Sequence, residues 1–135
     1  MNLKKSCSRT GAYILIDNLI QTGVDITEVR RIRQAVEKWG EDFLKRVFTE
    51  AEIKNAKTKT SFYQHLAGRF AAKEAIFKAA GDNKLSWRDI QIHNDQDGKP
   101  VCLFLNGRGK NINVHISISH VKTYAVANAI VTQKS

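Results

Sequence analysis

The hydrophobic residues of this chain recur with two different periods. Between positions 27 and 80 they return every three to four residues, which is the spacing of amphipathic helices. Thr27 has the hydroxyl of an N-cap for the first of these helices, and Gly81 suits the C-terminal cap of the last. Helices are therefore predicted from Thr27 through Trp39, around 43–48, from Thr49 onward, and over 62–80.

The remaining segments have the alternation of β-strands. Val114, Ile116 and Ile118 alternate with polar residues, as expected for a strand with one buried face. A turn at 95–98 separates two shorter apolar segments, as in a hairpin. The predicted strands are 19–26, 90–93, 101–105, 114–119 and 124–131. After the first strand the order is helices and then an antiparallel meander, which predicts a single α+β domain.

Composition and charge narrow the class of protein. Hydrophobic residues make up 42% and charged residues 26% of the 135 positions, so a folded domain is expected rather than a disordered chain. The formal net charge of +9 favours an anionic partner, such as a nucleic acid, an anionic lipid, a phosphorylated ligand or an acidic protein. The charge alone does not choose among these partners, and an inert basic surface is the simplest alternative.

Neither the cysteines nor the N-terminal segment indicates export. Cys7 and Cys102 lie far apart and form no CxxC motif, so they suggest neither a disulfide framework nor a zinc site. Segment 1–20 lacks the uninterrupted apolar run of a signal peptide or a membrane span. We therefore expect a cytoplasmic protein with no membrane span.

Four charged residues of the predicted helix 62–80 need partners. Arg69 and Lys73 fall inside its apolar arc, and Glu74 and Lys78 lie at the flank of that arc. One interpretation is an ordinary i, i+4 ion pair of Glu74 with Lys78, with the other two side chains extended toward water. The other is a site for a polyphosphate and Mg²⁺, which needs a second carboxylate. Asp25, at the end of the first strand, is a candidate for it, or else a turn or capping residue.

Three short segments form an ordered set. They are GVDITEVRRI at 23–32, AGRFAAKEAIFKA at 67–79, and HISISH at 115–120 followed by YAVA at 124–127. Together they resemble the opening motif, the signature helix and the closing hairpin of bacterial holo-acyl-carrier-protein synthases, a family of 4′-phosphopantetheinyl transferases. The resemblance covers about residues 20–131, and segments 85–90 and 97–100 also match. It implies a transferase domain at 19–135, whose antiparallel sheet wraps around or packs on the long helix, after an extension at 1–18.

The resemblance implies a substrate, a metal and a set of site residues. Such an enzyme transfers 4′-phosphopantetheine from coenzyme A to a serine of apo acyl carrier protein, giving holo carrier protein and 3′,5′-ADP and supporting fatty acid biosynthesis. Asp25 and Glu74 would hold Mg²⁺ against the pyrophosphate, and Lys78 would neutralise the breaking phosphate. Glu74 would accept the serine proton, directly or through a metal-bound water. Coenzyme A would also contact Arg69, Lys73, Gly98, Lys99, Pro100, Ser119 and His120.

The resemblance further implies partners. It suggests a homotrimer with each site at a subunit interface, where a neighbouring copy supplies the hairpin that lines the nucleotide. Basic residues near the first two helices would dock the acidic helix of the carrier protein through salt-sensitive contacts. They are Arg30, Arg31, Arg33, Lys45 and Arg46, with docking favoured for Arg31. The alternative is a solvated basic face that nearby acidic residues balance.

Two other classes of protein compete with this enzyme. A nucleic-acid-binding module would need a contiguous basic surface with exposed aromatic residues, whereas the aromatic residues here mostly occupy apolar helix positions. We therefore expect no nucleic-acid partner. An inactive scaffold of the same fold is disfavoured by the intact Asp25, Glu74 and Lys78. The chain also departs from the family pattern, because it lacks the glycine-rich loop after the signature helix and has a short connection at 106–111.

Overall fold

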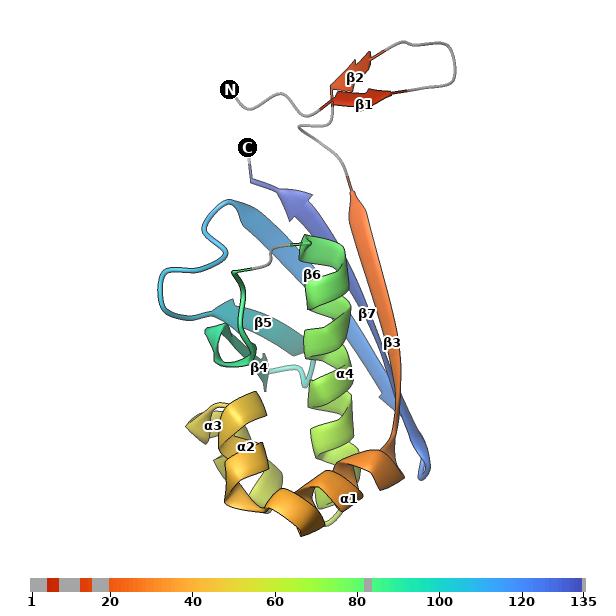
Figure 1. The fold of residues 1–135 in the computed structure, drawn as a ribbon, viewed down its shortest axis with the longest axis vertical. Coiled ribbons are helices and arrows are strands. Elements are labelled where there is room, and N and C mark those ends of the chain that lie inside the picture. Colours follow the sequence, from red (N-terminus) through yellow and green to blue (C-terminus); the bar gives the residue numbers. More distant parts are fainter. Residues whose placement is uncertain (1–4, 8–12, 16–19, 82–83, 135) are drawn as a thin grey trace.

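The computed structural model of the protein describes residues 5–7, 13–15, 20–81 and 84–134. Its long helix α4 packs along one face of a three-stranded antiparallel sheet of order β3–β7–β6 (Figure 1). The first strand of this sheet therefore pairs with the last strand of the chain. These elements are α4 (Phe62–Ala80), β3 (Gln21–Glu28), β6 (Ile112–His120) and β7 (Tyr124–Gln133).

Shorter elements lie around the N-terminal end and one side of α4 (Figure 1). They are the helices α1 (Val29–Trp39), α2 (Glu41–Val47) and α3 (Glu50–Lys57), the 3-10 turn η1 (Trp87–Asp89), and the strands β4 (Ile90–Asn94) and β5 (Pro100–Phe104). The strands β4 and β5 form a hairpin of their own. Two further strands, β1 (Lys5–Cys7) and β2 (Tyr13–Leu15), pair with each other.

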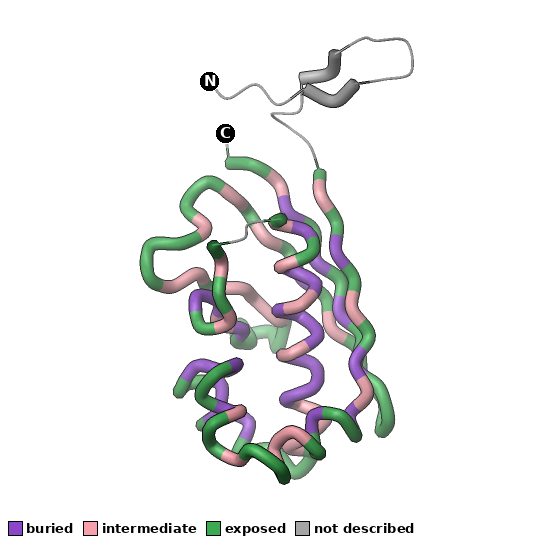
Figure 2. Tube along the Cα trace, viewed as in Figure 1, coloured by how far each residue is buried: buried purple, intermediate pink, exposed green. Residues whose placement is uncertain are grey.

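Small residues allow α4 to lie close to the sheet. Every second residue of β3 and β7 faces the helix, because side chains alternate along a strand. On β7 these residues are the fully buried Ala125, Ala127 and Ala129. On β3, Gly23 lies against α4, and a methyl group added there would overlap the carbonyl oxygen of Ala75. The buried residues of α4 belong to two hydrophobic clusters, one mainly with the inner sheet face and the β4–β5 hairpin and one mainly with the short helices (Figure 2).

A buried ion pair joins α4 to the short helices. The ammonium of Lys73 donates to Glu52 Oε1 at 2.7 Å and to the carbonyl oxygens of Val47 and Trp87 at 2.9 and 3.0 Å. Glu52 also accepts a backbone N–H from β4 at 2.8 Å. The exposed fractions of the Lys73 and Glu52 side chains are 0% and 1%. Burial lowers the pKa of Lys73, and the negative charge of Glu52 opposes that shift.

Local rules predicted several helix boundaries correctly. Helix α4 has the expected bounds, and Gly81 caps it in the left-handed conformation with φ of 62°. Gly40, with φ of 57°, separates α1 from α2. Thr49 begins α3 with a capping box, in which Thr49 and Glu52 each satisfy a backbone N–H of the other.

Two predictions about secondary structure are wrong: the N-cap of α1 and the arrangement of the strands after α4. Thr27 does not cap α1, because β3 extends to Glu28 by pairing with β7 and the Thr27 hydroxyl bonds to Asp25 instead. Glu28 is the N-cap residue and makes no side-chain capping bond. The strands after α4 do not form one meander, since β4 and β5 make a separate sheet. The predicted strand start at residue 19, like most of the extension 1–18, falls outside the described residues.

Replacing Gly23 by alanine is expected to destabilise the protein, because the added methyl group meets backbone atoms of α4. We expect the free energy of unfolding to fall by about 1–3 kcal/mol in urea denaturation. Gly68→Ala is the matched control, since its nearest new neighbour is a side-chain methyl of Ile118 and alanine favours the helix. Unchanged stability of Gly23→Ala would contradict the close contact.

Removing one member of the buried ion pair is expected to cost more than removing both. Lys73→Met leaves the Glu52 carboxylate buried without its counter-charge, and we expect a loss of about 3–5 kcal/mol. The double variant Glu52→Gln/Lys73→Met should lose less than the sum of the two single variants. Urea denaturation of all four proteins tests this coupling, and strictly additive losses would contradict it.

Candidate functional site

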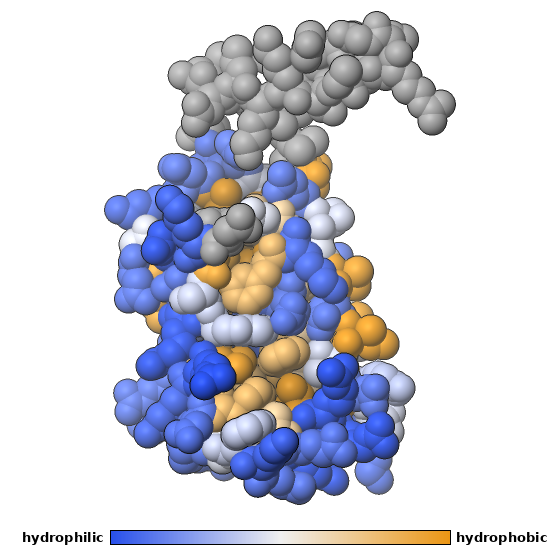
Figure 3. Space-filling model, in the orientation of Figure 1, coloured by the Kyte–Doolittle hydropathy of each residue, from blue (hydrophilic) through white to orange (hydrophobic). Residues whose placement is uncertain are grey.

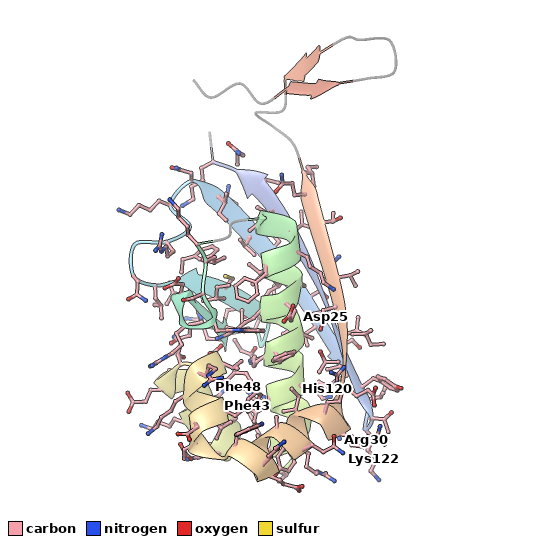
Figure 4. The ribbon with its side chains drawn as sticks, viewed as in Figure 1. Asp25, Arg30, Phe43, Phe48, His120 and Lys122 are labelled. Carbon is pink, nitrogen blue, oxygen red and sulfur yellow. The ribbon has the colours of Figure 1, made fainter. Side chains whose placement is uncertain are left out.

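A groove bordered by β3, α1, α2 and α4 brings together the two carboxylates predicted as a pair. Asp25 projects from β3 toward α4 (Figure 4), on the face that the strand alternation assigns to the helix. The groove encloses a cavity of about 430 Å³. Its lining includes Asp25, Arg31, Ile32, Phe43, Phe70 and Glu74.

Hydrogen bonds hold both oxygens of Asp25. The Thr27 hydroxyl donates to Oδ2 at 2.6 Å, and the Lys78 ammonium donates to Oδ1 at 3.4 Å. Lys78 also donates to the carbonyl oxygen of Val24 at 2.9 Å. The Asp25 side chain is 16% exposed and that of Lys78 is 54% exposed. The ion pair that forms in this groove is therefore Lys78 with Asp25, from two distant segments.

Glu74 lies close enough to Asp25 for the two carboxylates to repel each other. Burial raises the pKa of Glu74, and the negative charge of Asp25 raises it further, while Lys78 acts in the opposite direction. The groove thus concentrates negative charge in a partly buried position. A cation or a proton is needed to balance it.

The donors of this groove fit Mg²⁺. This hard cation takes one or two carboxylates and completes its octahedral shell with water and phosphate oxygens. Asp25 and Glu74 offer two carboxylates in one cavity. In the part of the chain that the structure describes, no cluster of three or more His, Cys, Asp or Glu side chains offers a cage for another metal. A divalent cation would also offset the repulsion between Asp25 and Glu74.

A second polar cluster surrounds Arg69. Its side chain is almost fully buried, and its Nη2 donates to Asn94 Oδ1 at 3.1 Å. Its Nε is buried without a hydrogen-bond partner among the described residues. Burial lowers the pKa of His65 to about 4, and electrostatic interactions with Arg69, Lys59 and His120 act in the same direction. This cluster therefore has an unused donor and a surplus of positive charge, which suits an anion.

Four residues around this cluster were not among those predicted from the sequence: Asn55, Lys59, His65 and Asn94. Asn94 borders a cavity of about 330 Å³ together with Asn55 and Lys59. His65 contacts Asn55, with 3.4 Å between Nε2 and Nδ2. The only sequence signal was that His65 precedes Arg69 by four positions, which places both on one helix face.

The structure corrects the expectation for Lys73. Its ammonium was expected to face coenzyme A phosphates, but it is fully buried and its three hydrogen bonds go to Glu52, Val47 and Trp87. A buried cation with this set of acceptors has a structural partner already. The position of Lys73 in the apolar arc of α4 gives no sign of this partner, because Glu52 lies on α3.

The remaining nucleotide-site candidates lie in two hairpins. Gly98 and Lys99 form the exposed turn between β4 and β5, and Gly98 has φ of 83°, which favours glycine. Pro100 begins β5 opposite Asn94, the partner of Arg69. Ser119 and His120 end β6, and His120 acts electrostatically on His65. These hairpins therefore border the Arg69 cluster and not the groove of Asp25.

The two clusters project from different sides of α4. Arg69 and Glu74 are five positions apart, which corresponds to about 140° around a helix. The groove of Asp25 and Glu74 does not include Arg69 in its lining. The groove and the Arg69 cluster are therefore separate in a single copy of the described chain.

The predicted docking residues are all exposed, but they differ in their surroundings. Arg31 lines the groove of Asp25 and Glu74. Arg30 pairs with Glu28 at 3.4 Å, and the guanidinium of Arg33 lies 5.0 Å from the centre of the Tyr63 ring. Lys45 and Arg46 are on the exposed face of α2. Polar side chains dominate this end of the molecule (Figure 3).

Comparison with known proteins identifies the family of this chain. Residues 21–129 match the profile of the 4′-phosphopantetheinyl transferase superfamily. The chain belongs to this superfamily. This phosphopantetheinyl transferase chain is 45% identical over 111 residues to the holo-[acyl-carrier-protein] synthase of Thermodesulfovibrio yellowstonii, an alignment that covers 82% of this chain and 96% of the relative.

Solved transferase structures share the fold. The holo-acyl-carrier-protein synthase of Bacillus anthracis, in complex with coenzyme A (3′,5′-ADP), superposes with a TM-score of 0.72 at 40% identity and covers 85% of this chain and 96% of its own. The Helicobacter pylori enzyme in complex with coenzyme A gives a TM-score of 0.74 at 32% identity, with coverage of 82% and 98%. These structures confirm the predicted α+β transferase fold. None of the described helices is long and apolar enough to cross a membrane.

Proposed function

We infer that this chain acts as a holo-acyl-carrier-protein synthase, which transfers 4′-phosphopantetheine from coenzyme A to a serine of apo acyl carrier protein. The products are 3′,5′-ADP and the holo carrier protein that fatty acid biosynthesis uses. The observation that carries this inference is the groove lined by Asp25 and Glu74, with Lys78 bonded to Asp25 beside it, in a chain 45% identical to a synthase of this kind. The free thiol of Cys102 is consistent with the reducing cytoplasm that the sequence predicts.

Three side chains in and beside the groove are proposed to have separate roles in the reaction. The serine oxygen attacks the β-phosphorus of coenzyme A, and the P–O bond to 3′,5′-ADP breaks with its electron pair on the leaving oxygen. Asp25 and Glu74 would hold Mg²⁺, which when bound would supply positive charge to the pyrophosphate. Lys78 is long and partly exposed, so its ammonium can move from Asp25 to the leaving phosphate. Glu74, which lines the same cavity, is proposed to accept the serine proton, directly or through a water molecule.

The Arg69 cluster is proposed to bind a phosphate at the nucleotide end of coenzyme A. Its support is the buried Nε without a partner and the positive charge around His65. The neighbouring hairpin residues would border the nucleotide: Gly98, Lys99, Pro100, Ser119 and His120. Lys73 is not part of this proposal, because its hydrogen bonds are satisfied in the interior.

A homotrimer is proposed to bring the Arg69 cluster of one copy to the Asp25 and Glu74 groove of another. The outer face of the sheet carries exposed apolar residues, which soluble proteins usually cover with a partner. They are Val24, Ile26, Val126 and Ile130, and Figure 3 shows apolar side chains along the edge where β3 runs. A neighbouring copy seated on this face could bring its Arg69 hairpins to the groove of Asp25 and Glu74.

Basic residues around the groove are proposed to dock the acidic carrier protein. Arg31 has the strongest support, because it is exposed and also lines the groove. The others are exposed on α1 and α2: Arg30, Arg33, Lys45 and Arg46. Their positive charges would steer an acidic helix so that its serine enters the groove.

A direct assay tests the function. Incubation with coenzyme A, Mg²⁺ and apo acyl carrier protein is expected to increase the intact mass of the carrier by one phosphopantetheine. Asp25→Asn and Glu74→Gln keep the size of each side chain but remove its charge, and we expect activity to fall by about 100-fold or more. Glu50→Gln, on the exposed surface of α3, is the control that should keep full activity.

The outcomes of this assay separate the function from its residue assignments. No mass gain with a range of apo carriers would overturn the transferase inference. Full activity of Glu74→Gln would overturn the assignment of Glu74 and leave the function standing.

Disrupting the outer sheet face should dissociate the assembly. Val126→Lys places a charge on the exposed apolar face and outside the lining of the groove, so we expect a smaller sedimenting species than the wild-type trimer and a parallel loss of activity. Trp39→Lys, an exposed position at the end of α1, is the matched control and should sediment as the wild type does. A fully active wild-type monomer would contradict the trimer proposal.

A further inference from the structure

Thr27 donates a side-chain hydrogen bond to Asp25, the carboxylate of the candidate metal site. It lies within β3 and is almost fully buried, and its hydroxyl donates to Asp25 Oδ2 at 2.6 Å. This is a short bond to a carboxylate, in the range of charge-assisted hydrogen bonds. The hydroxyl does not cap α1, since the N-cap residue of this helix is Glu28 and no side chain makes a capping bond there. The backbone N–H of Val29 instead donates to the carbonyl oxygen of Thr123 at 2.9 Å.

The sheet directs this hydroxyl to Asp25. Residues two apart in a strand lie on the same face, so Asp25 and Thr27 both point toward α4. Their cross-strand neighbours on β7 are Ala127 and Ala125, whose side chains have no polar atoms. The carboxylate is therefore the polar group that the strand places next to the Thr27 hydroxyl.

The two oxygens of Asp25 are held with different strength. Oδ2 has the short bond from the buried Thr27, whereas Oδ1 has a 3.4 Å contact from the partly exposed Lys78. The end of an aspartate side chain rotates in a broad energy well unless a neighbour selects one orientation. Thr27 thus fixes the plane of the carboxylate, and Oδ1 remains the oxygen that can exchange its partner.

We propose that Thr27 is a positioning residue for the metal site, which orients Asp25 so that Oδ1 is presented to the cation. The proposal rests on the proposed function, in which Asp25 is a ligand of Mg²⁺. Mg²⁺ requires nearly ideal octahedral geometry, so a freely rotating ligand binds it less well than a fixed one. Hydrogen-bonding partners of metal ligands typically change metal affinity by about 10-fold to 100-fold when they are removed.

Metal titrations of Thr27 variants test this proposal. Thr27→Val keeps the branched shape and removes the hydroxyl, and Thr27→Ser keeps the hydroxyl. Binding of Mn²⁺, followed by its electron paramagnetic resonance signal, is expected to weaken by about tenfold in Thr27→Val and to stay near the wild-type value in Thr27→Ser. Thr22→Val makes the same change on the outward face of the same strand and controls for the loss of a strand hydroxyl.

A kinetic readout separates positioning from a general structural defect. In Thr27→Val the Mg²⁺ concentration for half-maximal activity should rise by about the same factor, while kcat at saturating Mg²⁺ falls far less. Wild-type Mn²⁺ affinity in Thr27→Val would overturn the proposal. Equal weakening in Thr27→Val and Thr27→Ser would also overturn it, because the hydroxyl would then not be the cause.

The Asp25→Asn variant distinguishes failure of this proposal from failure of the proposed function. We expect Asp25→Asn to lose the specific Mn²⁺ binding of the wild type. If Asp25→Asn loses it and Thr27→Val does not, only the role of Thr27 is wrong. If Asp25→Asn binds Mn²⁺ as the wild type does, the metal assignment and the role of Thr27 are both wrong.

Discussion

The close contact of α4 with β3 and β7 is the constraint on which the rest of the structure depends. Glycine and alanine fill this contact, so no large side chain separates the helix from the sheet. Asp25 and Glu74 come from distant parts of the sequence, and they share one groove because these backbones touch. Dense packing transmits any widening at this contact to its surroundings, so the core and the site have the same geometric requirement.

The cations of α4 show that environment decides which residue can meet an anionic substrate. Lys73 is satisfied in the interior by Glu52 and two carbonyl oxygens. Arg69, one turn earlier, is nearly as buried but keeps a donor without a partner among the described residues. Lys78 lies beyond the core and contacts Asp25 at the surface. One helix therefore contains a structural cation and two cations that remain available.

The elements that depend on near neighbours could be predicted from the sequence. The bounds of α4, its Gly81 cap and the capping box of Thr49 follow from signals within about one helical turn. The residues alone offered Asp25 only as one candidate partner of Glu74, and the family resemblance made it the expected one, because neither segment contains information about the other.

The errors occur where tertiary contacts override a local signal. Threonine is a residue type that favours the N-cap position, but pairing of β3 with β7 extends the strand through Thr27. Lys73 and Arg69 occupy equivalent places on a helical wheel, and a glutamate 21 residues earlier distinguishes them only in three dimensions. Asn94 joins Arg69 through a strand that follows α4, and no spacing rule connects the two.

Strand β3 separates two kinds of surface by alternation alone. Gly23, Asp25 and Thr27 face the helix, while Val24 and Ile26 face outward. Inserting or deleting a single residue within the strand would exchange these faces completely, since side chains alternate with a period of two. A change in the residue count of β3 would therefore disturb the carboxylate site and the apolar surface in one step, whereas a change in the length of the connection at 106–111 would leave both faces of β3 in register.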